Sequence, residues 1–341
     1  MWATKYRPKN YEEVVGQKNA IAILKKSLGN ANTFIIQGPS GVGKTTLARI
    51  FATSINGEAI EINGADNNGV DNVRNLISSA TYQPVFNDYR VFIIDECHML
   101  TNAAWNALLK ILEESPKTTL WMLCTTEPSK IPATIKSRST LVPLTRVSRD
   151  SITTRLKDIL ENENKTVSDD IIQEIVVHAE GRVREAIVKL ETYVTTGVLA
   201  LPFSTLDIIK LMRAIYKQDA VYVISATADM TNDDLLALIR FLSDYLKLLL
   251  VRKQLPPSVK TEEILKQFTS ISPTYLPELR DFQDALWQSV STQENQWEAS
   301  LNTLRFFYEN VMDHYTDFRD TGRALEFIIL YEVAQGYIGR K

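Results

Sequence analysis

The sequence predicts an α/β nucleotide-binding domain that is followed by all-helical domains. From Thr33 to Arg146, short β-branched runs alternate with helical stretches, as in a parallel sheet covered by helices. Beyond Ser148 the strand-like runs disappear, and amphipathic helical periodicity continues to the C-terminus. The length of 341 residues also exceeds that of one ordinary domain.

The expected sheet consists of five buried strands connected by helices. The strands are expected at Thr33–Gln37, Ala59–Asn63, Val91–Asp95, Leu120–Cys124 and Thr140–Leu144. Helices are expected at Lys44–Ile55, Val70–Ala80 and Thr101–Glu114, and Pro116 stops the last of these. Such an alternation is typical of nucleotide-binding folds before any motif is considered.

The helical part of the chain divides in two. Helices at Ser148–Glu163, Ser168–Glu180 and Arg182–Thr196 are expected to form a small lid-like bundle. The segment Gly197–Ser204 has the composition of a connector, and Thr205–Lys341 is again helical in pattern. The expected domains are therefore 1–147, 148–200 and 205–341.

The composition favours a reducing, cytoplasmic compartment. Hydrophobic residues make up 45% and charged residues 23%, which is typical of a soluble globular protein. Cys97 and Cys124 are too few for a zinc cluster or a disulfide framework. The N-terminal segment has no apolar signal core, and charged residues interrupt Leu235–Val251, the most apolar later stretch. We expect no membrane span and no export.

A phosphate-binding loop is the strongest motif in the sequence. Residues Gly38 to Thr45 match G-x-x-x-x-G-K-[ST] between an expected strand and an expected helix. The glycines let backbone amides face the phosphates, Lys44 neutralises phosphate oxygens, and the Thr45 hydroxyl can ligate Mg²⁺. The cofactors expected are ATP and Mg²⁺. The nucleotide-binding residues expected here are Gly38, Pro39, Ser40, Gly41, Val42, Gly43, Lys44, Thr45 and Thr46.

Two carboxylates follow the third expected strand. Asp95 is expected to hold the Mg²⁺ shell, and Glu96 to polarise the attacking water. A surface acidic pair is the alternative, which the buried strand ahead of it disfavours. Cys97 and His98 come next and are interpreted as packing or linker residues, because two adjacent residues without further partners are poor metal ligands.

Three further positions have a less specific signal. Thr126 follows the strand expected beside that of Asp95, so its hydroxyl could reach the γ-phosphate or the attacking water. Arg138 and Arg184 are isolated basic residues, and spacing alone does not distinguish them from surface groups.

Several runs, in order, resemble the clamp-loader branch of AAA+ ATPases, namely the bacterial tau/gamma subunit and the small subunits of replication factor C. The runs are Tyr6-Arg7-Pro8, Val14-Val15-Gly16-Gln17, Asp95-Glu96-Cys97-His98-Met99-Leu100, Ala107-Leu108-Leu109-Lys110, Glu113-Glu114-Ser115-Pro116, Cys124-Thr125-Thr126-Glu127-Pro128 and Ile135-Lys136-Ser137-Arg138. The resemblance implies a P-loop AAA+ domain, a small helical lid domain and an all-α collar that holds subunits together.

The resemblance also implies roles for single residues. Thr126 would be sensor 1, Arg184 would be sensor 2, and Arg138 would be the arginine finger that enters a neighbouring subunit's ATP site. With these roles the expected catalytic residues are Glu96, Lys44, Arg138 and Thr126. The residues expected to flank the nucleotide base are Tyr6, Arg7, Val14 and Val15.

The chain also departs from the tau/gamma pattern. Only Asn56–Glu58 stands where the bacterial subunit inserts a four-cysteine zinc module, so no zinc is expected. Ile62–Arg74 instead resembles the replication factor C subunits, as would suit a phage-encoded loader, and Arg74 is the candidate DNA contact. An apolar tip at Tyr82, Pro84, Val85 and Phe86 is either a clamp contact or ordinary core.

The function implied is that of an ATPase subunit of a DNA sliding-clamp loader. Its partners would be a sliding clamp, primer–template DNA and further loader subunits in a pentameric assembly, and no membrane. One alternative is another DNA-acting AAA+ ATPase, of the branch-migration or fork-maintenance type. A second alternative is a nucleotide-dependent scaffold with little turnover.

Overall fold

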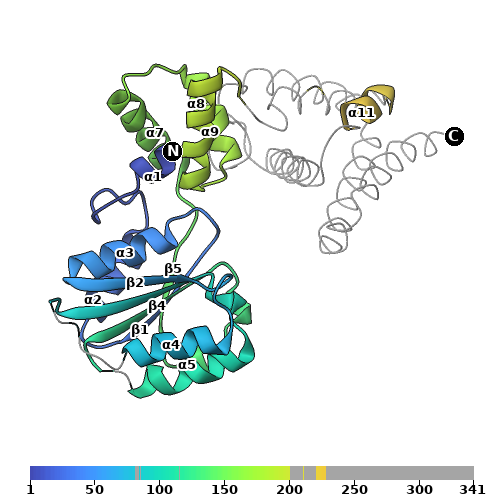
Figure 1. Cartoon of the computed structure of the whole chain (residues 1–341). Helices are drawn as coiled ribbons and strands as arrows, with labels where there is room; N and C mark the ends of the chain where they lie inside the picture. Colours follow the sequence, from blue (N-terminus) through green and yellow to red (C-terminus); the bar gives the residue numbers. More distant parts are fainter. Residues whose placement is uncertain (81–83, 85, 115, 200–209, 211–219, 228–341) are drawn as a thin grey trace, which may run out of the picture. The chain divides into compact units, whose positions relative to one another are not determined.

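The computed structural model describes residues 1–80, 84, 86–114, 116–199, 210 and 220–227 (Figure 1). The chain forms two compact units, of which the first contains residues 1–167 and 179–198 and the second contains 168–178 and 199–341. The expected collar therefore lies outside the described residues, except for Lys210 and the helix α11 (Ala220–Thr227). Among the described residues, no helix is both long and apolar enough to span a bilayer.

The first unit is built on a five-stranded parallel sheet with the order β2-β3-β4-β1-β5. The strands are β1 (Thr33–Gln37), β2 (Gly57–Asn63), β3 (Tyr89–Asp95), β4 (Thr119–Thr125) and β5 (Thr140–Pro143). All five predicted strands are confirmed, although β2 and β3 begin two residues earlier than expected. Every residue of the central strand β4 is buried, whereas the edge strand β2 is largely exposed.

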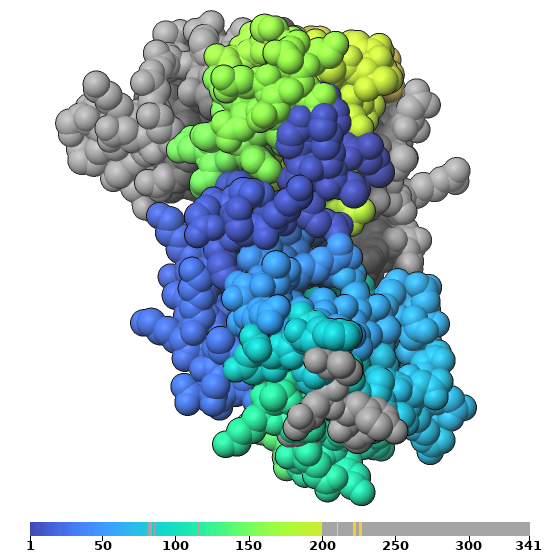
Figure 2. Space-filling view, turned by 60° about the vertical axis from the view of Figure 1, so that its left-hand side comes forward, coloured from blue at the N-terminus to red at the C-terminus, as the bar shows by residue number. Residues whose placement is uncertain are grey.

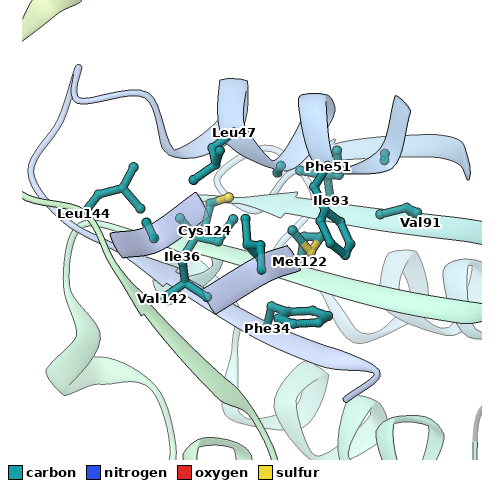
Figure 3. Packing of buried hydrophobic residues seen from close by; sticks show 14 of the residues in the cluster. Phe34, Ile36, Leu47, Phe51, Val91, Ile93, Met122, Cys124, Val142 and Leu144 are labelled. Atoms are coloured by element: carbon teal, nitrogen blue, oxygen red, sulfur yellow. The ribbon is translucent and has the colours of Figure 1, made fainter. Parts of the chain in front are cut away.

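One face of the sheet packs against α2 (Lys18–Ser27) and α3 (Lys44–Ser54). Strand residues that alternate in sequence share this face, because successive side chains of a strand point to opposite sides. Leu47 and Phe51 of α3 lie over Ile36, Ile93 and Met122 of three neighbouring strands (Figure 3). This contact fixes the helix that follows the phosphate-binding loop onto the sheet.

The opposite face is covered by α4 (Val70–Ala80), α5 (Asn102–Glu114) and the short α6 (Ala133–Lys136). Its largest side chains are Phe92 of β3 and Trp121 of β4, which are register neighbours. Their rings stack with centroids 4.5 Å apart and an interplanar angle of 18°. The central strands β1, β3 and β4 are therefore buried on both sides, whereas the edge strands β2 and β5 are not, contrary to the expectation of five buried strands.

The three helices predicted after Ser148 are also present. They are α7 (Arg149–Asn162), α8 (Asp169–His178) and α9 (Val183–Thr196), and α8 belongs to the second unit. Ser148 caps α7 by accepting a hydrogen bond from the Ser151 amide, and α9 ends at Gly197, which has a φ of 72°. The expected domain boundaries remain predictions.

Hydrogen bonds attach the N-terminal segment to α9 and to the C-terminal end of α7 within the first unit. The Trp2 amide of α1 (Trp2–Lys5) donates to Glu191, and Lys5 and the Tyr6 hydroxyl both donate to Glu163, each at 2.6 Å. These two hydrogen bonds lower the pKa of the Glu163 carboxyl. The segment runs along the molecular surface (dark blue in Figure 2). The sequence analysis predicted no element before Thr33, so α1 and α2 were missed.

We predict that Trp121→Ala lowers the free energy of unfolding by about 3–5 kcal/mol, because it leaves a large cavity between Phe92 and the helices. Trp121→Phe is expected to lower the free energy of unfolding far less. The buried indole Nε1–H finds no hydrogen-bond partner among the described residues, so its removal leaves no acceptor unpaired. Urea unfolding followed by circular dichroism measures the free energy of unfolding of both variants, and an equal decrease in the two would contradict the prediction.

Candidate functional site

The carboxyl ends of the parallel strands carry the candidate site. The phosphate-binding loop runs from β1 into α3, and its lysine, Lys44, is 6% exposed. Lys44 Nζ donates to the carbonyls of Gly38 and Pro39, at 3.1 and 3.0 Å. A Cβ at Gly38 would lie 2.6 Å from the Leu144 carbonyl oxygen, so only glycine fits beside β5. The loop is thus held close to the sheet with its lysine turned inward.

Thr45 and Asp95 form the candidate cation site. The Thr45 hydroxyl donates to Asp95 Oδ2 at 2.7 Å, and Asp95 Oδ1 accepts from the Glu96 amide at 3.1 Å. One hydroxyl and one carboxylate are hard oxygen ligands, and such a sparse set leaves further positions for water and phosphate oxygens. The donor chemistry therefore fits Mg²⁺.

Glu96 lies in a strained backbone position beside this pair. Its φ and ψ are 46° and 43°, in the left-handed region that non-glycine residues rarely adopt. Its Oε2 accepts from the Thr126 hydroxyl at 3.2 Å. β3 and β4 are paired, so Asp95 and Thr126 come from neighbouring strand ends, as the sequence predicted.

Gly64, which the sequence analysis missed, supports this strained turn. It directly follows β2, and its amide donates to the Asp95 carbonyl at 2.7 Å. A Cβ at this position would lie 2.8 Å from the Glu96 carbonyl oxygen. In the sequence, the only sign of this role was a glycine directly after an edge strand. The close approach of Gly64 to Glu96 depends on the ends of β2 and β3 lying side by side, which the sequence does not show.

The two residues after Glu96 have different environments. Cys97 is buried, as expected of a packing residue, and burial together with the charges of Glu96 and Asp95 raises the pKa of its thiol. His98, in η1 (Cys97–Met99), has a side chain that is only 7% exposed, but both ring nitrogens contact polar groups. The packing interpretation of His98 therefore missed its polar contacts.

Arg184 contacts the site from outside the sheet, and Arg7 belongs to the segment before β1. The Arg184 amide donates to the Gly41 carbonyl at 3.3 Å, so the start of α9 contacts the phosphate-binding loop. Burial lowers the pKa of the Arg7 guanidinium, and the positive charges of Arg49 and Arg184 lower it further. The positive charge of Arg184 therefore acts on the Arg7 guanidinium.

The other residues expected to flank the base are less directly involved. The Tyr6 hydroxyl is bonded to Glu163, and the Tyr6 carbonyl accepts from Arg155 at 2.9 Å. Val14 and Val15 are half-buried. Their contact with a base stays a prediction.

Arg138 is not brought to this site. Its guanidinium pairs with Glu113 of α5 at 2.5 Å and donates to the Thr134 carbonyl of α6 at 2.9 Å. Within the described residues it makes no hydrogen bond or ion pair with Lys44, Asp95 or Glu96. The side chain is 45% exposed, as is possible for a group that acts outside its own subunit.

The candidate nucleic-acid and clamp contacts lie away from the phosphate-binding loop. Arg74 is exposed on α4 and pairs with Asp71, at 3.1 Å. Phe86 is 93% exposed and Pro84 is half-buried, whereas Tyr82 and Val85 lie outside the described residues. In the described part of the chain, no cluster of three or more His, Cys, Asp or Glu side chains is arranged to bind a metal ion.

The sequence is similar to subunits of bacterial DNA polymerase III. The model of the family "DNA polymerase III, delta subunit" matches residues 58–148. The tau subunit of Bacillus subtilis is 35% identical over 63% of this chain and 42% of its own length. The gamma subunit of Buchnera aphidicola is 33% identical over 57% of this chain and 62% of its own length. The gamma/tau subunit of Mycobacterium tuberculosis is 37% identical over 52% of this chain and 36% of its own length.

Among solved structures, the branch migration motor RuvB of Thermotoga maritima matches with a TM-score of 0.48 and 22% identity. That match covers 57% of this chain and 68% of the other. The chain spans less than two thirds of the length of the gamma and tau relatives. The resemblance to these subunits that the motifs predicted is confirmed, and so is a five-stranded parallel sheet with flanking helices.

We predict that Gly64→Ala slows ATP hydrolysis about 10-fold or more while nucleotide affinity changes little. The added methyl group must push the Glu96 carbonyl away, and displacement of a catalytic group by about 1 Å can cost 100-fold in rate. Steady-state hydrolysis and fluorescent-nucleotide binding test this. Gly69→Ala is the matched control, since a Cβ there meets nothing within 4 Å. Equal rates for the two variants would disprove the role of Gly64.

Proposed function

We propose that this chain, a relative of the gamma and tau subunits of DNA polymerase III, is the ATPase subunit of a DNA sliding-clamp loader. ATP binding would let its assembly hold an open clamp, and primer–template DNA would trigger hydrolysis and release of the closed clamp onto DNA. The contacts from Thr45 through Asp95 and Glu96 to Thr126 are the observation that carries the ATPase part. The relatives support the loader part.

Within the site, each residue has a distinct chemical role. The amides of residues 38–46 and the Lys44 ammonium would bind the phosphates, at the N-terminus of α3. Thr45 and Asp95 would hold Mg²⁺, which when bound neutralises charge on the phosphate oxygens. Glu96 would accept a proton from the water as the water oxygen attacks the γ-phosphorus and ADP leaves. Thr126 would orient Glu96 and the water.

Completion of the site would require a neighbouring subunit. Negative charge on the transferred phosphoryl group calls for a cation, and an arginine supplied by a neighbour is worth roughly 10³–10⁵ in rate in related enzymes. Arg138 meets this need in trans, since its own contacts are with Glu113 and Thr134. Arg184 would supply a second positive charge from the start of α9. ATP turnover would then depend on assembly.

The remaining assignments belong to the same proposal. The assembly would be a pentamer in the cytoplasm, with domains 1–147, 148–200 and 205–341 and without zinc. Tyr6, Arg7, Val14 and Val15 would flank the base, and Arg74 would contact DNA. A branch-migration motor or a scaffold is not favoured, because the relatives at 33–37% identity are DNA polymerase III subunits.

We predict that the ATPase rate rises most with a recessed primer–template and rises further with one sliding clamp. The steady-state rate of the purified protein should be compared without DNA and with single-stranded, blunt duplex and primed DNA, each with and without candidate clamps. A primed junction binds a loader in its hydrolysing state, so ligand and state stabilise each other. A rate indifferent to DNA structure and to every clamp would contradict the proposal.

We predict that Arg138→Ala and Glu96→Gln are each inactive with DNA but recover activity when mixed. A Glu96→Gln subunit can still offer Arg138 to a neighbour that retains Glu96, so random mixing restores about one site in four. Lys44→Ala loses nucleotide binding as well, whereas Arg138→Ala retains it. Recovery is measured by steady-state hydrolysis after co-refolding or subunit exchange, and a mixture as inactive as its components would place Arg138 in cis.

A further inference from the structure

We propose that His98 is a positioning residue for ATP hydrolysis, which holds the Glu96 carboxylate and ties it to the loop after β4. This inference rests on the proposed ATPase function. His98 Nδ1 lies 3.3 Å from Glu96 Oε2, and Nε2 lies 3.3 Å from Glu127 Oε1. One imidazole therefore bridges two carboxylates that come from the ends of two neighbouring strands.

The local fold explains how the histidine reaches Glu96. The one-turn helix η1 starts directly after the left-handed Glu96, and the Met99 amide donates to the Glu96 carbonyl at 3.0 Å. This turn folds His98 back beside the side chain of Glu96. The His98 side chain is only 7% exposed, whereas that of Glu96 is 35% exposed. The ring is thus largely enclosed, whereas Glu96 keeps exposed surface that a water molecule can reach.

The polar environment of the ring fits a supporting role. Nδ1 also lies 3.2 Å from the Thr125 hydroxyl, which accepts from the Glu127 amide at 2.9 Å. Glu96 Oε2 receives both the His98 contact and the Thr126 hydrogen bond. Both contacts go to the same oxygen, so together they restrain the orientation of the carboxylate. A base must be held in hydrogen-bond geometry to act efficiently.

The second ring nitrogen extends this support to the next segment of the chain. Glu127 is also paired with Lys130 of η2 (Pro128–Lys130), at 3.0 Å. The same segment continues through α6 to Arg138, the residue proposed to act on a neighbouring site. His98 therefore links the carboxylate of its own site to the segment that carries the arginine for another.

The test is a set of variants in the whole chain, assayed for ATP hydrolysis with Mg²⁺ and primed DNA and for fluorescent-nucleotide affinity. His98→Ala is expected to lower kcat about 10-fold to 100-fold and to leave nucleotide affinity nearly unchanged. His98→Asn, whose side-chain amide can take the position of Nδ1, is expected to recover much of the rate. His98→Gln places its amide near Nε2, closer to Glu127, and is expected to recover less.

A double mutant separates positioning from general stability. If His98 acts through Glu96, His98→Ala should cost nothing further in a Glu96→Gln background. His178→Ala is the matched control, because the side chain of His178 is 11% exposed and faces a buried carboxylate, that of Glu174, on α8. It removes the same imidazole and is expected to lower the unfolding temperature without changing kcat.

The outcomes distinguish the two proposals. Wild-type protein without ATP hydrolysis, or full activity in Glu96→Gln, would overturn the proposed function and this inference with it. An active wild type with an unaffected His98→Ala would overturn only the inference. The inference would also fail if His98→Asn recovered no more than His98→Ala, or if His98→Ala weakened nucleotide binding as much as it slowed hydrolysis.

Discussion

The parallel pairing of β1, β3 and β4 is the constraint on which the site depends. It brings three strand ends to one edge of the sheet, so Thr45, Asp95 and Thr126 meet although they lie up to about eighty residues apart in the chain. Burial on both faces holds this alignment. Leu47 and Phe51 fix the loop helix from one side, and Trp121 and Phe92 close the other. The hydrogen bond from Thr45 to Asp95 is therefore a consequence of the core rather than of any local preference.

The backbone is strained at Glu96, where the proposed chemistry takes place. Glu96 has a backbone conformation that costs of order 1–3 kcal/mol for a non-glycine residue. Gly64 makes room for this turn, because it approaches the Glu96 carbonyl more closely than any Cβ permits. The result is a carboxylate that leaves the strand direction and turns beside Asp95. A regular continuation of β3 would instead alternate the two side chains to opposite faces of the sheet.

The sequence predicted the parts that depend on local pattern. Short β-branched runs indicated the five strands, and the loop motif indicated Lys44 and Thr45. The helix α2 was missed although Ala20 and Leu24 lie one turn apart on its buried face, so that signal was present in the sequence. The contacts of His98 could not be predicted, because they need the η1 turn and a glutamate from the next strand end. Gly64 depends in the same way on the approach of two strand ends.

His98 and Arg138, which are both proposed to support hydrolysis, differ in burial. This difference suits their roles. His98 is enclosed and contacts fixed partners, so its geometry is set within one subunit. Arg138 pairs with Glu113, and both side chains are nearly half exposed, so water weakens the pair and little is lost when the arginine leaves it. A side chain that acts on a neighbouring subunit must be only weakly bound within its own subunit. Because Glu127 and Arg138 belong to one connection between β4 and β5, a shift of that connection on assembly would act on both ATP sites at once.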